Sequence, residues 1–162
     1  MKVAPGQLRQ PSIALALSFG LGLIPWSPGS FGAAGAFVIY VLAAPLHWGW
    51  QAGLTALLFA LGCLACGRAA AALGEEDHQS IVWDETVGML MVLVLVPPTL
   101  LSWLAGFMLF RVFDIVKPWP ISAIDRNIHG GLGVMLDDAM AAIPAAVCVW
   151  ALHLAFTAQS FP

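Results

Sequence analysis

Charge gathers in one stretch of this apolar chain, FDIVKPWPISAIDRNIHGGLGVMLDD at residues 113–138, which holds four of the nine carboxylates and two of the six basic residues. The 162 residues are 60% hydrophobic and 9% charged, whereas a soluble domain carries about 25% charged residues. So few charges do not cover a water-facing surface, and the mean hydropathy is +0.90. We therefore predict an all-α polytopic membrane helical bundle, a single domain over residues 1–162, with this stretch at its wet mouth.

Outward from this stretch, apolar runs predict five helices that cross or nearly cross a bilayer, because about 20 helical residues span the ~30 Å hydrocarbon core. Trp48-Gly49-Trp50 and Pro97-Pro98 predict tight reversals, which give two helical hairpins and a final lone span. Another run, Ile13–Ile24, is too short to span and is expected to form a re-entrant or interfacial helix. The candidate spans are Ala33–Leu46, Gln51–Cys66, Ile81–Val96, Thr99–Val112 and Asp138–Phe156.

The charged residues define one side of these hairpins. If the N-terminus lies inside, all six lysines and arginines fall on the inner side, in agreement with the positive-inside rule. The carboxylates fall there too, although acidic residues contribute little to topology, and charge beside hydrocarbon marks a functional site by default. The net charge of −3, without clustered basic residues, argues against a nucleic-acid partner.

Two stretches suit an anionic ligand. GLGLIPWSPGSFGA at residues 20–33 breaks the helix, and Ser30 or a neighbour is expected to cap a helix that begins near Phe31 and offers free amides to phosphate. The alternative is a plain helix break. In FRVFDIVKPWP, Arg111, Asp114 and Lys117 share a helical face. That face suits an anion bridged by a metal, or else forms a salt-bridged rim at the membrane surface.

The carboxylates of DHQSIVWDETVGM, residues 77–89, begin a predicted helix. Asp84 and Glu85 are adjacent and diverge by about 100° on a helix, so one is expected to bind metal while the other caps or pairs. His78 is open to three interpretations, as a ligand, a base or an exposed loop residue.

DRNIHGGLGVMLDD, residues 125–138, adds a second group of acids. Asp125 and His129 are expected on one helical turn, and the glycines that follow permit close approach of a ligand. Asp137 and Asp138 are expected to open the last apolar helix, where carboxylates favour the N-terminus. Clusters of oxygen ligands of this kind suit Mg²⁺.

Together these motifs resemble the phosphatidylglycerophosphatase A family of bacterial membrane phosphatases. The resemblance rests on SPGSFG, SIVWDETVGM, FRVFDIVKPWPI and DRNIHGGLGVMLDD in that order, and it runs from about Gly20 to Ala142. It implies a multi-pass protein of the bacterial cytoplasmic membrane with its active site on the cytoplasmic face. It also implies Mg²⁺-dependent removal of the terminal phosphate of phosphatidylglycerophosphate, which yields phosphatidylglycerol and inorganic phosphate.

Residue roles follow as hypotheses, with either a metal-activated water or an aspartate as the nucleophile. The expected metal ligands are Asp84, Glu85, Asp114, Asp137 and Asp138. The expected catalytic residues are Asp84, Glu85, Asp125, His129 and Asp138. The expected phosphate-binding residues are Ser30, Arg111, Lys117, Arg126, Gly130 and Gly131.

Two other functions compete with this interpretation. A CDP-alcohol phosphotransferase also sets aspartates around Mg²⁺ at a membrane face, but the chain lacks that family's D-x2-D-G-x2-A-R run. A transporter or scaffold with a cation-binding vestibule would place ionisable groups near the bilayer midplane, whereas the predicted spans are nearly free of charge.

Overall fold

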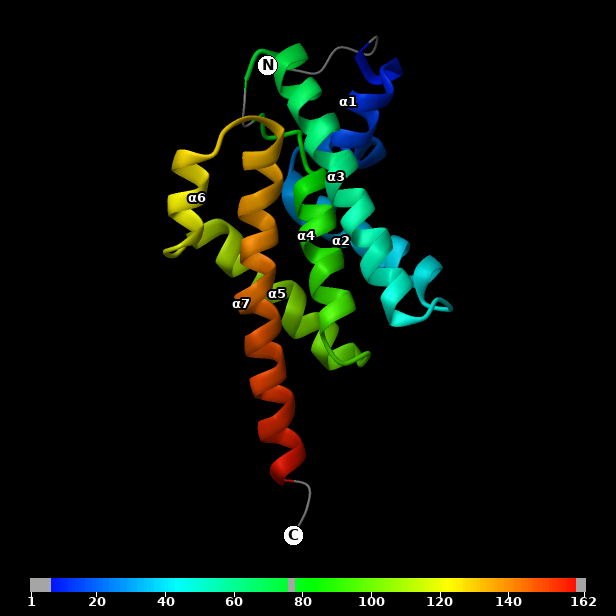
Figure 1. Cartoon of the computed structure of the whole chain (residues 1–162), viewed down its shortest axis with the longest axis vertical. Coiled ribbons are helices and arrows are strands. Elements are labelled where there is room, and N and C mark those ends of the chain that lie inside the picture. The colour runs from blue at the N-terminus through cyan, green and yellow to red at the C-terminus, as the bar shows by residue number, and fades with distance from the viewer. Residues whose placement is uncertain (1–6, 76–77, 160–162) are drawn as a thin grey trace.

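The computed structural model describes residues 7–75 and 78–159, and every regular element within those ranges is helical. The all-α prediction is confirmed, and the five predicted apolar segments occur as helices in the predicted order (Figure 1). They are α2 (Pro28–Ala43), α3 (Trp48–Leu73), α4 (Trp83–Leu95), α5 (Leu100–Val116) and α7 (Gly130–Gln159). The shorter elements are the 3₁₀ helices η1 (Gln7–Arg9) and η2 (Ser18–Leu23) and the helices α1 (Pro11–Ala16) and α6 (Ile121–Asn127).

The apolar helices differ in length. Among the described helices, α3 and α7 are long and apolar enough to cross a membrane, judged by length and composition alone. α4 has 13 residues, which rise only about 20 Å against a hydrocarbon core of ~30 Å. Large apolar side chains such as Leu42, Leu101 and Val147 are exposed on the outer faces of the bundle, which soluble monomers rarely show. These features indicate a membrane-associated protein.

α4 is the central helix, packed against α2, α3, α5 and α7 (Figure 1). Beyond its first turn α4 is apolar all around, and a helix of that kind is buried in a protein core or spans a membrane. Two indole groups bond to carbonyls of its last turn, from Trp48 Nε1 to Val94 O (3.1 Å) and from Trp150 Nε1 to Leu95 O (2.8 Å). These carbonyls lack partners within the helix, so the bonds hold α3 and α7 against the end of α4.

Several predicted boundaries are wrong. Trp48 to Trp50 do not form the reversal but open α3, and the turn lies at residues 44–47. The reversal at Pro97-Pro98 is confirmed. The last helix begins at Gly130 rather than at Asp138, so Asp137 and Asp138 lie inside α7 and not at its N-terminus.

The N-terminal segment Ile13–Ile24 is not one helix. The chain turns at Ser18, Phe19 and Gly20, which all have positive φ, and so separates α1 from the rest of η2. The Ser18 hydroxyl shares a 2.7 Å hydrogen bond with Thr86, and Val82 N donates to Ala16 O (2.9 Å). These bonds fix the N-terminal segment against the start of α4.

Candidate active site

The first turn of α4 carries Asp84 and Glu85, where the positive end of the helix dipole favours carboxylates. The next residue anchors this turn, because Thr86 Oγ1 bonds to Gly32 O of α2 (2.8 Å). Gly32 permits the close approach, since a Cβ there would lie 2.6 Å from Val82 O. The start of α4 is therefore fixed between α2 and the N-terminal segment.

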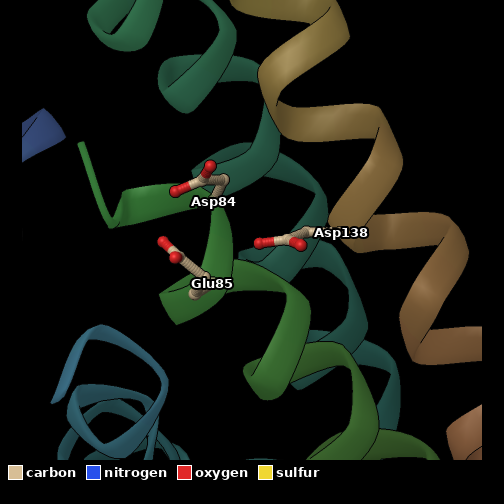
Figure 2. A group of neighbouring side chains, drawn as sticks. All are labelled: Asp84, Glu85 and Asp138. Atoms are coloured by element: carbon tan, nitrogen blue, oxygen red, sulfur yellow. The ribbon is translucent and has the colours of Figure 1, made fainter. Parts of the chain in front are cut away.

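Asp138 of α7 faces this turn, and Figure 2 shows the three carboxylates of Asp84, Glu85 and Asp138 turned toward a common space. One oxygen of each lies within 4.8 Å of the others. α7 comes close because Gly88 leaves room for it: a Cβ on Gly88 would lie 3.2 Å from Asp138 Cβ. Asp84 and Glu85 therefore reach the same space, contrary to the expectation that they point apart, and their roles as metal ligands stay predictions.

Each of these three carboxylates has one oxygen without an internal partner. Asp84 Oδ1, Glu85 Oε2 and Asp138 Oδ2 are buried without a hydrogen-bond partner, and Asp138 is only 3% exposed. Buried oxygens that carry like charge repel each other, and a cation beside them offsets both the repulsion and the cost of burying the charge. A set of oxygen donors alone matches the preference of Mg²⁺, which adds water and phosphate oxygens to a few carboxylates. The residues present therefore fit a divalent cation.

Asp114, a second predicted metal ligand, has a different partner. Its Oδ2 lies 2.5 Å from Arg111 Nη1, and the same nitrogen lies 3.7 Å from Glu85 Oε1. Arg111 Nε is buried with no hydrogen-bond partner. The guanidinium group thus lies beside Glu85 and Asp114 and retains one donor for a further acceptor.

Asp137, also a predicted metal ligand, is paired with Lys117. The lysine Nζ lies 2.5 Å from Asp137 Oδ2 and 2.6 Å from Asp125 Oδ1. Burial favours the neutral amine, but the hydrogen bonds to Asp125 and Asp137 outweigh it, so the pKa of Lys117 is raised above its ordinary value. Lys117 also has φ 44° at the end of α5, a conformation unusual for a residue with a side chain.

A cavity of about 360 Å³ joins these groups. Its walls are the N-terminus of α2 at Ser27 and Gly29, the first turn of α4, the last turns of α5 and the acids of α7. A Cβ on Gly29 would overlap Glu85 Oε1. The cavity therefore combines carboxylates, two cationic side chains and a helix N-terminus, a combination suited to a metal-bound phosphate group.

A smaller cavity of about 80 Å³ lies on the other side of Asp84 and Asp137, which line both cavities. Asp125, His129 and Gly130 line the smaller cavity. The expectation that Asp125 and His129 share a helical turn is wrong, because α6 ends at Asn127 and His129 lies in the link to α7. They nevertheless face the same space.

The other predicted residues lie away from the larger cavity. α2 begins at Pro28 after Ser27, so Ser30 is not its cap, although the two serine hydroxyls are bonded at 2.7 Å. Gly131 makes its close approach to α3, because a Cβ there would lie 2.7 Å from Gly67 N. Arg126 is exposed on α6 and is not among the described residues that line either cavity.

His78 is also not the exposed loop residue that was one interpretation. It is buried, and its Nδ1 accepts a hydrogen bond from Ser80 N (3.2 Å). Asp77, at the start of the same stretch, lies outside the described residues.

The sequence model described as Phosphatidylglycerophosphatase A matches residues 14–153. The chain belongs to the phosphatidylglycerophosphatase A family. It is therefore a phosphatase, and the carboxylate cavity lies within the matched region.

Individual members support the assignment to the phosphatidylglycerophosphatase A family. The Haemophilus influenzae Phosphatidylglycerophosphatase A is 44% identical over 148 residues, which cover 90% of this chain and 91% of that protein. The Escherichia coli Phosphatidylglycerophosphatase A is 40% identical over 141 residues, or 86% and 82%. A Bacteroides thetaiotaomicron protein named "Putative phosphatidylinositol-3-phosphatase" is 34% identical over 148 residues, or 84% and 91%. No solved structure matches the chain.

Sequence reasoning missed six residues that line the larger cavity of this family member: Ser27, Pro28, Gly29, Gln79, Ile81 and Ile115. One signal was available, since proline favours the first helical position and Pro28 therefore points to Ser27 as the residue before the helix. Gln79 and Ile115 carry no such signal, because their positions depend on how the helices pack.

Proposed function

We propose that the chain hydrolyses the terminal phosphomonoester of phosphatidylglycerophosphate, producing phosphatidylglycerol and inorganic phosphate for phospholipid biosynthesis, with Mg²⁺ as cofactor. The observation that carries this proposal is the group of three buried carboxylates with unpartnered oxygens, which faces a cavity also lined by Arg111 and Lys117. Members of the family named for this activity cover most of the chain.

Asp84, Glu85 and Asp138 would hold the ion, because their carboxylates converge and one oxygen of each has no hydrogen-bond partner. Mg²⁺ bound there would supply Lewis acidity toward the phosphoryl group and toward the attacking water. The hydrogen bond from Thr86 to Gly32 of α2 fixes the first turn of α4, which carries two of the three ligands.

Arg111 and the N-terminus of α2 suit the phosphoryl group. Arg111 Nε is a buried donor without an acceptor, and a phosphate oxygen would satisfy it. Ser27 and Gly29 place the positive end of a helix of 16 residues at the same cavity. Lys117 adds a positive charge, because the raised pKa of its ammonium group keeps it protonated. These groups stabilise charge that develops on the phosphoryl oxygens.

Proton transfer falls to groups of the smaller cavity. When the bond from phosphorus to the glycerol oxygen breaks, that oxygen needs a proton, and the attacking water must lose one. Asp125 and His129 line the smaller cavity, and Asp84 lines both this cavity and the larger one. We assign them as the acid and base. An aspartate of the carboxylate group remains the alternative nucleophile. The stereochemical course at an isotopically chiral phosphorus distinguishes the two routes, because one direct displacement by water inverts it and two successive displacements retain it.

We further propose a multi-pass arrangement in the bacterial cytoplasmic membrane, with the carboxylate end of the bundle at the cytoplasmic face. The apolar outer faces of the helices support insertion, and the basic side chains Arg111, Lys117 and Arg126 support the orientation by lying at one end.

The test is phosphate release in detergent micelles with and without Mg²⁺. We expect release from phosphatidylglycerophosphate that stops on chelation and resumes when Mg²⁺ is restored. Phosphatidylinositol 3-phosphate belongs in the same panel because of the name of the Bacteroides relative. Release that is unaffected by chelation overturns the metal assignment. No release from any lipid phosphomonoester overturns the function and favours the phosphotransferase or transporter alternatives.

A further inference from the structure

The larger cavity has one exposed apolar edge. Ile115 lines it together with the charged groups, yet this side chain is 70% exposed on the outer surface of α5. Ile81, the other isoleucine of the lining, is buried. The polar cavity therefore borders directly on an apolar outer surface at Ile115.

Ile115 ends a stripe of exposed apolar side chains that follows α5. The spacing of three or four residues places the stripe on one helical face. From its first to its last member it rises through 14 residue steps, or about 21 Å of helix, which exceeds the ~15 Å that one leaflet contributes to the hydrocarbon core. The members of this α5 stripe are Leu101, Leu104, Met108, Val112 and Ile115.

α2 carries a second stripe at the same spacing, formed by Phe31, Ala34, Val38 and Val41. Aromatic pairs join the two helices away from the cavity. The rings of Phe37 and Phe107 are 6.4 Å apart and those of Tyr40 and Trp103 are 5.6 Å apart. Toward the other end of this seam, Ser27 and Gly29 of α2 and the last turns of α5 line the cavity instead. The α2–α5 seam is thus closed by rings at one end and opens into the polar cavity at the other.

Tryptophans flank this opening. Trp26 directly precedes Ser27 of the lining, Trp119 comes two residues after Lys117, and both indoles are largely exposed. Exposed tryptophans favour the membrane–water interface. They would place the mouth of the cavity at the depth of the lipid headgroups.

We propose that the lipid substrate enters sideways from the bilayer through the α2–α5 seam, with its acyl chains along the α2 and α5 stripes and its phosphates passing over Ile115 into the cavity. This inference rests on the proposed phosphatase function. The acyl chains stay in an apolar environment throughout, so entry costs none of the ~0.8 kcal/mol per methylene that transfer to water requires. The polar headgroup alone exchanges water for the charged cavity.

Kinetics of two matched variants test this route. Ile115→Trp adds bulk at the mouth, whereas Val116→Trp adds the same bulk on a neighbouring side chain that is 67% exposed and does not line the cavity. We expect Ile115→Trp to raise KM for long-chain phosphatidylglycerophosphate about tenfold, as for lost contact with about two methylene groups. The inhibition constant of inorganic phosphate should remain at the wild-type value, and Val116→Trp should match wild type in both constants. An unchanged KM, or equal changes in both constants, overturns the route.

A photo-crosslinking measurement requires no turnover, so it separates failure of this route from failure of the proposed function. A photoreactive phenylalanine analogue replaces Ile115 or Val116 in vesicles that contain radiolabelled phosphatidylglycerophosphate. At position 115 we expect crosslinking that excess inorganic phosphate suppresses, because phosphate competes for the cavity. At position 116 crosslinking should reflect bulk lipid and remain unaffected. Identical behaviour at the two positions overturns the route even if the enzyme hydrolyses the lipid.

Discussion

Two sets of carboxylates meet at the charged end of the bundle, and they differ in what neutralises them. The unpaired set is Asp84, Glu85 and Asp138, each with a buried oxygen that has no hydrogen-bond partner. The paired set is Asp114, Asp125 and Asp137, whose oxygens bond to Arg111 or Lys117. The chain supplies cations for the second set and leaves the first set in deficit, which is the arrangement expected when an external cation completes the site.

The two sets should therefore respond in opposite ways to loss of charge. Removal of one acid from the unpaired set relieves repulsion in the protein but destroys the metal site. Removal of one partner from the paired set leaves an uncompensated charge in a buried position, which is strongly destabilising.

Asp84→Asn should have the largest effect. It should lower phosphate release by at least about 10³-fold, or about 4 kcal/mol of transition-state stabilisation, because a ligand of the ion is lost. Wild-type Tm should rise with added Mg²⁺ and the variant's should not, since only a folded state that binds the ion gains from it. Glu75→Gln removes the same charge from an exposed residue beyond the cavity and is the matched control. Normal activity in Asp84→Asn, with normal membrane insertion, would refute the metal assignment.

Arg111→Met should come next, because it removes a phosphate donor and the partner of Asp114. We expect activity to fall about 10²-fold and the free energy of unfolding to fall by about 3 kcal/mol. The double variant with Asp114→Asn distinguishes the two roles. It should recover stability without recovering activity. If the double variant is no more stable than Arg111→Met, the loss of stability in the single variant does not come from the broken ion pair with Asp114.

The division of the six acids into an unpaired and a paired set could not be predicted from the sequence. All six acids were found from their motifs, but the five expected metal ligands among them were treated alike. Asp84 and Asp138 lie 54 positions apart, and their meeting depends on the packing of α4 against α7 at Gly88. The choice between a metal and a side-chain cation as partner depends on distances between helices, which periodicity within one helix does not contain.

The helices themselves could be predicted from the sequence, but their exact limits depend on packing in the same way. The apolar runs located all five long helices, because burial and lipid contact both require continuous apolar residues. The start of α7 was missed because Asp137 and Asp138 interrupt hydropathy, although carboxylates inside a helix do not interrupt its hydrogen bonds. Gly131 was read as a ligand contact and instead allows α7 to approach α3. A glycine in sequence does not reveal which group comes close to it.

Lys117→Met tests the other cation of the paired set. It leaves Asp137 buried without its ammonium partner, and we expect the free energy of unfolding to fall by about 2 kcal/mol, less than for Arg111 because the lysine is closer to solvent. Adding Asp137→Asn should restore most of the loss, as measured by thermal unfolding in detergent. A double variant no more stable than the single one would show that Lys117 acts through its position at the end of α5 rather than through this charge.

Asp125→Asn should have the smallest effect on stability. It compares an exposed and a buried member of the paired set. Asp125 and Asp137 bond to the same Lys117 nitrogen at nearly equal distances, but the side chain of Asp125 is 41% exposed and that of Asp137 is 11% exposed. Solvent screens the exposed pair, so Asp125→Asn should cost less than about 1 kcal/mol. Most of that cost should disappear in 1 M salt, where the Debye length is about 3 Å. Thermal unfolding at low and high salt measures both quantities. A loss as large as that of Lys117→Met, or one that salt leaves unchanged, would place Asp125 with the buried carboxylates and would mean that α6 shields this ion pair from water.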